Sequence, residues 1–196
     1  MYPNFVSLVL FCIAAGFTPG PNNILGSYQG FNFGIKKSLP LIMGVTLGYT
    51  FLLIVLATGL IVIFKNYPLL QLILKICGSA FLIYLAYKIS FKNKIEQHKV
   101  THPVNFFDTF IFQFVNPKGV IIGITTISTF IETESSYLLH SFIVIGVASS
   151  VAISSITSWC LLGKFLRRFA TNEKFIRIFN HVMSFLLIVC VIMFYL

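Results

Sequence analysis

Six long apolar segments fill most of the sequence and constrain what it can fold into. They are Phe5–Tyr28, Ser38–Phe64, Pro68–Tyr87, Phe106–Ile131, Tyr137–Leu162 and Phe175–Leu196. A helix needs about 20 predominantly apolar residues to cross a bilayer, whereas a typical soluble domain has about 25% charged residues. This chain is 57% hydrophobic and 10% charged. The pattern predicts an all-α membrane protein, a single transmembrane domain over residues 1–196 with six transmembrane helices.

The charged residues between these segments predict an orientation. Ten basic residues fall in the first, third and fifth connections: Lys36, Lys37, Lys88, Lys92, Lys94, Lys99, Lys164, Arg167, Arg168 and Lys174. The second and fourth connections hold only Lys65, with Glu132 and Glu134 beside the fourth. Because basic loops stay in the cytoplasm, we expect both termini outside it. Short basic loops between apolar segments also argue against a nucleic-acid surface, despite a net charge of +9.

Motifs of common catalytic centres do not occur in the sequence. It has no G-x-x-x-x-G-K-[ST] phosphate loop, no H-E-x-x-H and no G-x-S-x-G. Its four cysteines lie singly in apolar segments, which indicates packing residues and neither a disulfide nor a metal site: Cys12, Cys77, Cys160 and Cys190. We therefore expect no enzyme and no cofactor. A secondary transporter fits these features.

Two of the apolar segments are interrupted by proline. The first contains "GFTPGPNN" (residues 16–23) and the fourth contains "FQFVNPKG" (residues 112–119). A proline inside a helix costs about 3 kcal/mol, and the backbone groups that it frees cannot bond to water in hydrocarbon. Such breaks persist only against protein or a wet cavity. They indicate a functional site, and the alternative is a pair of kinks that only shape the helices.

The two breaks also define a repeat. Pro117 follows Pro19 by 98 residues, half of the 196-residue chain. Residues 1–90 and 104–196 thus form two halves of three segments, each starting with a broken helix. Three segments per half invert the second half relative to the first, and matching breaks then mark the substrate site. Glycines at four-residue spacing follow both breaks and allow close helix packing: Gly26, Gly30, Gly34, Gly119 and Gly123.

The residues at the breaks suit a small zwitterion. Half-helices starting at Asn22 and Lys118 would present unpaired N–H groups and positive dipole ends, which favour a carboxylate. Carbonyls freed before the prolines would accept bonds from an ammonium group. We predict a substrate-binding site made of Pro19, Gly20, Pro21, Asn22, Asn23, Gln113, Asn116, Pro117 and Lys118.

Three further ionisable residues are candidates for a coupling or secondary role. Ionisable groups inside a membrane segment are functional candidates by default. Lys75 lies in the third segment, where the alternative is a side chain reaching the outer headgroups. Asp108 is a carboxylate inside the fourth segment, and Arg177 and His181 lie one turn apart in the sixth. We expect these two to pair with Asp108 or to carry a proton.

Three stretches of the chain resemble a known family. "TPGPNNIL", "CGSAFLIYLAYK" and "FVNPKGVI" are similar to the LysE/RhtB family of bacterial amino-acid exporters, and the similarity covers nearly the whole chain. The resemblance implies a plasma-membrane protein that exports small amino acids or their derivatives from the cytoplasm, driven by the proton gradient. The lack of an acidic residue close to the breaks favours a neutral amino acid.

Two other functions fit the same residues. One is an ion or small-solute permease with the same plan, and the other is a non-transporting membrane subunit that packs against a partner. The expected partners are a small amino acid and the lipid bilayer. The glycine-spaced faces also permit a homodimer.

Overall fold

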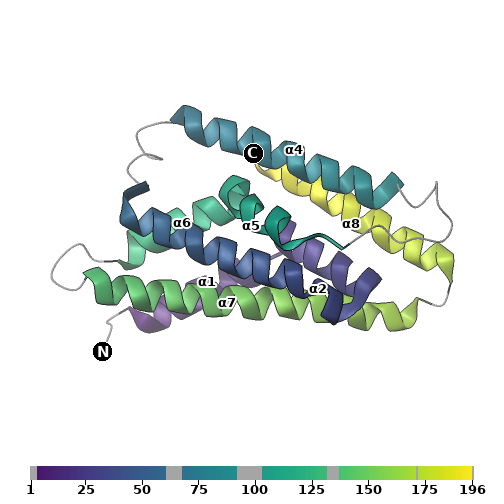
Figure 1. Ribbon diagram of the computed structural model, residues 1–196, viewed down its shortest axis with the longest axis horizontal. Coiled ribbons are helices and arrows are strands. Elements are labelled where there is room, and N and C mark those ends of the chain that lie inside the picture. The colour runs from purple at the N-terminus through teal and green to yellow at the C-terminus, as the bar shows by residue number, and fades with distance from the viewer. Residues whose placement is uncertain (1–3, 61–67, 92–102, 132–136, 171, 196) are drawn as a thin grey trace.

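The described part of the chain is entirely helical. The computed structural model describes residues 4–60, 68–91, 103–131, 137–170 and 172–195. Its helices are α1 (Phe5–Phe17), α2 (Pro21–Val55), the short η1 (Leu56–Leu60), α4 (Pro68–Phe91), α5 (Phe106–Val115), α6 (Pro117–Phe130), α7 (Tyr137–Leu166), the short η3 (Arg167–Phe169) and α8 (Glu173–Met193). Figure 1 shows α4 beside α8 along one side and α1, α2 and α7 along the other. The predicted all-α class is confirmed.

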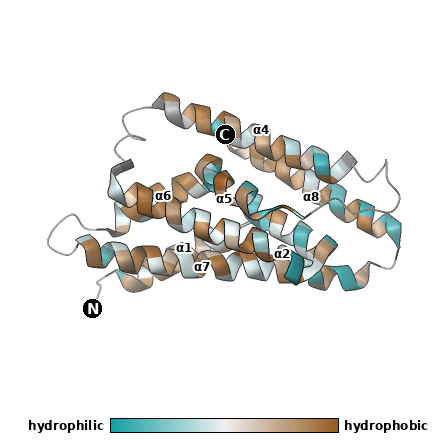
Figure 2. Ribbon diagram, viewed as in Figure 1, coloured by the Kyte–Doolittle hydropathy of each residue, from teal (hydrophilic) through white to brown (hydrophobic). Residues whose placement is uncertain are grey.

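Several helices are apolar enough to cross a membrane. Among the described residues, four pass by length and composition, namely Pro21–Gly59, Leu72–Ser90, Tyr137–Phe169 and Glu173–Met193. The bent pair α5 and α6 adds a fifth if it is one span. Hydrophobic residues predominate along these helices in Figure 2. Many of their large apolar side chains are exposed, and Phe142 is 77% exposed. Such a surface is suited to lipid, so the chain is a multi-pass membrane protein.

The number of candidate spans is lower than the six predicted segments because the first two segments do not form two separate helices. The predicted segment Phe5–Tyr28 is divided between α1, which has only 13 residues, and the start of α2. The remainder of α2 covers the second segment, whose end at residues 61–64 lies outside the described residues. The predicted orientation rests partly on residues that also lie outside them: Lys65, Lys92, Lys94, Lys99, Glu132 and Glu134.

Helix α2 is divided at Gly34 into a first arm, residues 21–33, and a second arm, residues 35–55. The first arm runs parallel to α7. The Oγ of Ser155 lies 3.5 Å from the Oδ1 of Asn23, and Ser27 donates a hydrogen bond of 3.2 Å to the carbonyl of Trp159. Residues further along α2 therefore contact residues further along α7.

The second arm of α2 returns in the opposite direction. At Thr50 the partner on α7 is Ser149, with 2.7 Å between the two hydroxyl oxygens, so the contact has moved back along α7. The reversal occurs at Gly34, whose φ of 74° and ψ of 171° lie in a region open almost only to glycine. Because Gly34 makes this turn, its predicted role in close helix packing is wrong.

Close packing does occur earlier in the same arm. A Cβ added to Gly30 would overlap the carbonyl oxygen of Cys160, and one added to Gly26 would lie 2.8 Å from Ile156. A Cβ added to Gly123 would lie 2.9 Å from Leu56, so the predicted close packing of glycine faces is found at these three positions. At Gly119 a Cβ would make only ordinary contacts.

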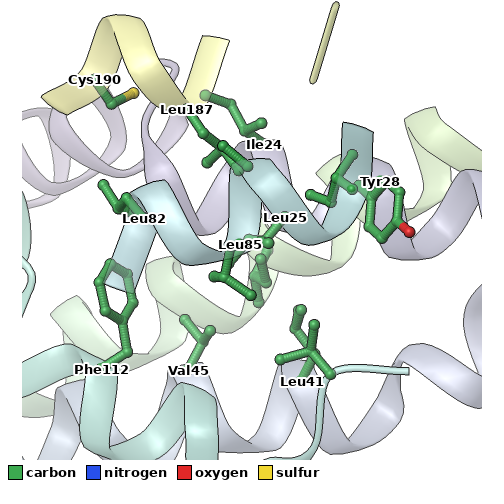
Figure 3. Close-up of a cluster of buried hydrophobic side chains, with 14 of the residues drawn as sticks. Ile24, Leu25, Tyr28, Leu41, Val45, Leu82, Leu85, Phe112, Leu187 and Cys190 are labelled. Atoms are coloured by element: carbon green, nitrogen blue, oxygen red, sulfur yellow. The ribbon is translucent and has the colours of Figure 1, made fainter. Parts of the chain in front are cut away.

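Two buried apolar clusters form the core, and both breaks lie between them. The cluster in Figure 3 joins α2, α4, α5, α7 and α8 and includes Leu25, Val45, Leu85, Phe112 and Leu187. The second cluster joins α1, the end of α2, α6 and α7 and includes Leu8, Leu52, Val120, Phe130 and Val144. From α1 to α2, and again from α5 to α6, the chain passes from one cluster to the other. Each break therefore connects the two clusters.

The contact at Gly30 gives a test of the fold. Gly30→Ala should lower the free energy of unfolding by about 1–3 kcal/mol because the new methyl group forces α2 away from α7. Gly146→Ala on α7 is the matched control, since no atom lies within 4 Å of a Cβ there. The fluorescence of the single tryptophan, Trp159, reports thermal unfolding in detergent. Equal stability of the two variants would contradict the packing described.

Candidate functional site

Both prolines that follow the breaks begin helices. Pro21 lies in the first turn of α2 and Pro117 in the first turn of α6. First-turn N–H groups have no partner within the helix, so these prolines remove no hydrogen bond. The expected cost of about 3 kcal/mol for an interior proline therefore does not apply to Pro21 or Pro117.

The connecting residues at both breaks are extended. In the first break Thr18 has φ −61° and ψ 142°, and Gly20 has φ −174° and ψ 176°. The second break consists of Asn116 alone, with φ −80° and ψ 101°, and the chain bends there by 63°. Each break leaves helix ends whose backbone groups need partners from elsewhere.

Lys118 joins the two breaks. Its Nζ donates hydrogen bonds to the carbonyl of Thr18 at 2.8 Å, to the hydroxyl of Thr18 at 3.0 Å and to the carbonyl of Pro19 at 3.3 Å. A Cβ on Gly20 would lie 2.8 Å from Cδ and 2.9 Å from Nζ of the lysine, so glycine leaves the space that Lys118 fills. Charge-assisted bonds of this kind are among the stronger ones, and they satisfy carbonyls that the end of α1 leaves open.

A second contact between the breaks is a pair of amides. Asn22 Nδ2 donates to Gln113 Oε1 at 2.8 Å, and Gln113 Nε2 donates back to Asn22 Oδ1 at 3.2 Å. Gln113 is completely buried and also donates to the carbonyl of Thr109 at 2.8 Å. The predicted residues Asn22 and Gln113, 91 residues apart, are thus brought together.

Asn23 closes the first break from within. Its Nδ2 donates to the carbonyls of Gly16 and Thr18, each at 2.9 Å. Ser155 of α7 donates to the same Gly16 carbonyl at 2.8 Å. Asn23 and Ser155 therefore replace the helix hydrogen bonds that α1 would have made had it continued.

The carbonyls before the three prolines already have partners. Lys118 bonds to Thr18 O, while Gly20 O and Asn116 O accept the first helix bonds of α2 and α6, at 2.9 and 3.0 Å. Gly20 O and Asn116 O each accept one such bond and keep a second lone pair, so our expectation that carbonyls before the prolines receive the ammonium group of a substrate stays a prediction. The chain has used them to stabilise its own breaks.

Other polar groups at the breaks have no partner among the described residues. The side-chain Oδ1 of Asn116 is buried and accepts no hydrogen bond from them, and none of their side chains caps the start of α2 or α6. By contrast, Asn105 caps α5 and Asn172 caps α8, each through a bond of 2.8 Å. The starts of α2 and α6 thus keep N–H groups and positive dipole ends for another acceptor.

These groups surround a small cavity of about 90 Å³ between α1, α2, α5, α6 and α7. Seven of the nine predicted site residues line it: Gly20, Pro21, Asn22, Asn23, Gln113, Asn116 and Lys118. The other two, Pro19 and Pro117, line a larger neighbouring cavity. Among the described residues that line the small cavity, Lys118 is the one lysine or arginine and no carboxylate is present. The arrangement suits a solute with an anionic group and without an extra positive charge.

Several lining residues were not predicted from the sequence. Cys12, Tyr49 and Ser155 contribute to the small cavity, and Thr18 holds Lys118. Ser155 belongs to a stripe of hydroxyl residues in the fifth apolar segment, which was a signal for it. Tyr49 had no such signal because only the reversal at Gly34 brings it to the cavity.

The secondary candidates lie elsewhere. Asp108 is exposed in the first turn of α5, and it forms no ion pair with Arg177 or His181 in the described part of the chain. The predicted pairing is therefore wrong. Both basic residues lie on an outer groove of α8, whereas Lys75 lines the larger cavity with its Nζ 4.4 Å from the centre of the Tyr195 ring.

Two asparagines at the breaks should differ in their effect on stability. Asn23→Ala should lower the free energy of unfolding by about 1–3 kcal/mol because the carbonyls of Gly16 and Thr18 lose a donor. Asn116→Ala should leave it unchanged or raise it slightly, since the buried Oδ1 makes no hydrogen bond to another described residue and its desolvation cost is removed. Thermal unfolding in detergent measures both. A larger loss in the Asn116 variant would contradict this assignment.

Comparison with known proteins identifies the family of this chain. The sequence matches the family described as "LysE type translocator" over residues 13–196. It is 28% identical over 185 residues to the cysteine/O-acetylserine efflux proteins of Escherichia coli strain K12 and strain UTI89, covering 93% of this chain and 92% of each relative. No solved structure matches the chain at a significant level. The chain is a transporter and not an enzyme, and it belongs to the LysE family of membrane translocators.

Proposed function

We propose that this protein exports small neutral amino acids or their derivatives from the bacterial cytoplasm, and that the solute binds where the two breaks meet. The relatives named as efflux proteins for cysteine and O-acetylserine support this class of solute. The observation that carries the proposal is the small cavity, which combines one lysine, two uncapped helix starts and an unpartnered amide oxygen.

The carboxylate of the solute binds at the helix starts. The free N–H groups of α2 and α6 and the ammonium of Lys118 all favour an anion. A carboxylate in the cavity competes with Thr18 and Pro19 for the hydrogen bonds of Lys118. The lysine then exchanges backbone carbonyls for a stronger acceptor.

The ammonium group of the solute binds to Asn116. Its buried Oδ1 lacks a donor, and such an atom carries a desolvation cost that a bound ammonium group would remove. A second positive charge on the solute would have no carboxylate to meet among the described lining residues. The cavity of about 90 Å³ also favours a short side chain.

The proposed architecture is six membrane crossings in two inverted halves. The reversal of α2 supports two crossings in the first 60 residues, the first of them completed by α1. Ser184 of α8 donates to the carbonyl of Ala86 of α4 at 2.8 Å, and the two residues are 98 apart. This is also the separation of Pro19 and Pro117, and a contact between equivalent residues is expected where they lie beside a two-fold axis between the halves. Export is driven by the proton gradient.

Removing the lysine tests the site. Lys118→Ala should reduce counterflow of labelled small neutral amino acids in proteoliposomes by about 10- to 100-fold, as expected for a lost bond to a charged group. Lys164→Ala, on an exposed position of α7, is the control and should transport normally. Protein levels in the membrane and thermal stability establish that both variants fold.

Normal counterflow in the folded Lys118→Ala variant would overturn the proposed site. If the unaltered protein conducts inorganic ions but no amino acid, it is a permease of another class. If it moves no solute at all, the proposal that it is a transporter of amino acids fails in favour of a structural subunit.

The proposed orientation has its own test. Both termini should lie outside the cytoplasm because the basic connections stay inside. Alkaline phosphatase fused to the C-terminus should therefore be active, and a fluorescent protein that folds only in the cytoplasm should stay dark there. The opposite pair of results would reverse the orientation without affecting the site.

A further inference from the structure

A second, larger cavity lies on the other side of the breaks. Its volume is about 520 Å³, and α4, α6 and α8 form most of its wall. Leu74, Ile121, Ile124 and Met193 make that wall mainly apolar. Thr18, Pro19 and Pro117 line it from the breaks.

The two cavities are separated by the groups that hold the breaks together. Gly20, Pro21, Lys118 and Ile122 line both cavities. The Lys118 ammonium bonds across this boundary to Thr18 and Pro19, at 2.8 to 3.3 Å. The partition between the cavities is therefore one lysine side chain and a short extended segment.

The larger cavity has a cation of its own. Lys75 lines it, and the aromatic ring of Tyr195 is the only partner seen for its ammonium in the described part of the chain. An aromatic ring is a weaker partner than a carboxylate. No aspartate or glutamate is among the described residues that line this cavity. Its charge therefore favours an anionic group, and its apolar wall favours a small organic one.

From these observations we infer that the larger cavity is a second binding station for the transported solute, with Lys75 as the cation that receives its carboxylate. The inference rests on the proposed function, because the solute reaches this station from the small cavity. Lys118 is common to both stations. When its ammonium leaves Thr18 and Pro19, the partition opens and the carboxylate passes from Lys118 to Lys75.

The native cysteines report on both stations without any substitution. Cys12 lines the small cavity and Cys190 lines the larger one, while Cys77 is exposed and Cys160 is completely buried. Full-length protein in proteoliposomes is treated with N-ethylmaleimide, with and without a saturating transported amino acid such as cysteine's oxygen analogue, serine. Mass spectrometry measures the labelling rate of each thiol separately.

The solute should slow labelling of both Cys12 and Cys190 by up to about twofold, as expected if it divides its time equally between two stations. Cys77 is the control and should keep its rate. Protection of Cys12 alone would overturn the second station and leave the proposed function intact. Protection of neither cysteine would overturn the proposed site as well.

Substitution of Lys75 gives an independent measurement. Lys75→Gln should raise the KM for transport by about tenfold, in line with a lost bond between charged groups, while Lys75→Arg should restore most of it. Lys88→Gln is the matched control, because Lys88 also lies on α4 over a tyrosine ring but lines neither cavity. An unchanged KM in folded Lys75→Gln protein would overturn the role of Lys75, whatever the thiols show.

Discussion

The ammonium group of Lys118 bonds to backbone oxygens of Thr18 and Pro19, across about a hundred residues of sequence. In hydrocarbon every backbone polar group needs a partner within the protein. A helix that stops at Phe17 leaves carbonyls which only side chains can reach, and Lys118, Asn23 and Ser155 supply the donors. The rest of the structure depends on these hydrogen bonds, because each break is stable only when the other lies beside it.

The core brings the breaks into that position. Each break lies where the chain passes from one apolar cluster to the other, so packing on both sides holds the opened ends together. The tight contact of Gly30 with Cys160 and the turn at Gly34 then fix both arms of α2 against α7. As a result Tyr49 of the second arm reaches the cavity that Asn22 of the first arm also lines.

Capping distinguishes the helix starts at the breaks from those of α5 and α8. Asn105 and Asn172 cap α5 and α8, whereas the asparagine at the start of α6 leaves its side-chain oxygen without a donor. An asparagine in that place normally stabilises its helix. Here the capping interaction is absent at both breaks, and the proposed transport site is made of the groups left open. Asn23 thus stabilises the first break through its hydrogen bonds, whereas the side-chain oxygen of Asn116 at the second break is available to the proposed solute.

The sequence alone determined the helical membrane class, because long apolar segments have few stable alternatives in a bilayer. It also identified seven residues of the small cavity, since prolines and amides stand out against an apolar background. Only the tertiary structure decided which oxygens are already bonded, that Asp108 lies apart from His181, and that Lys75 belongs to a different cavity from Asn116. These facts depend on distances between segments far apart in the chain, which local residue patterns do not contain.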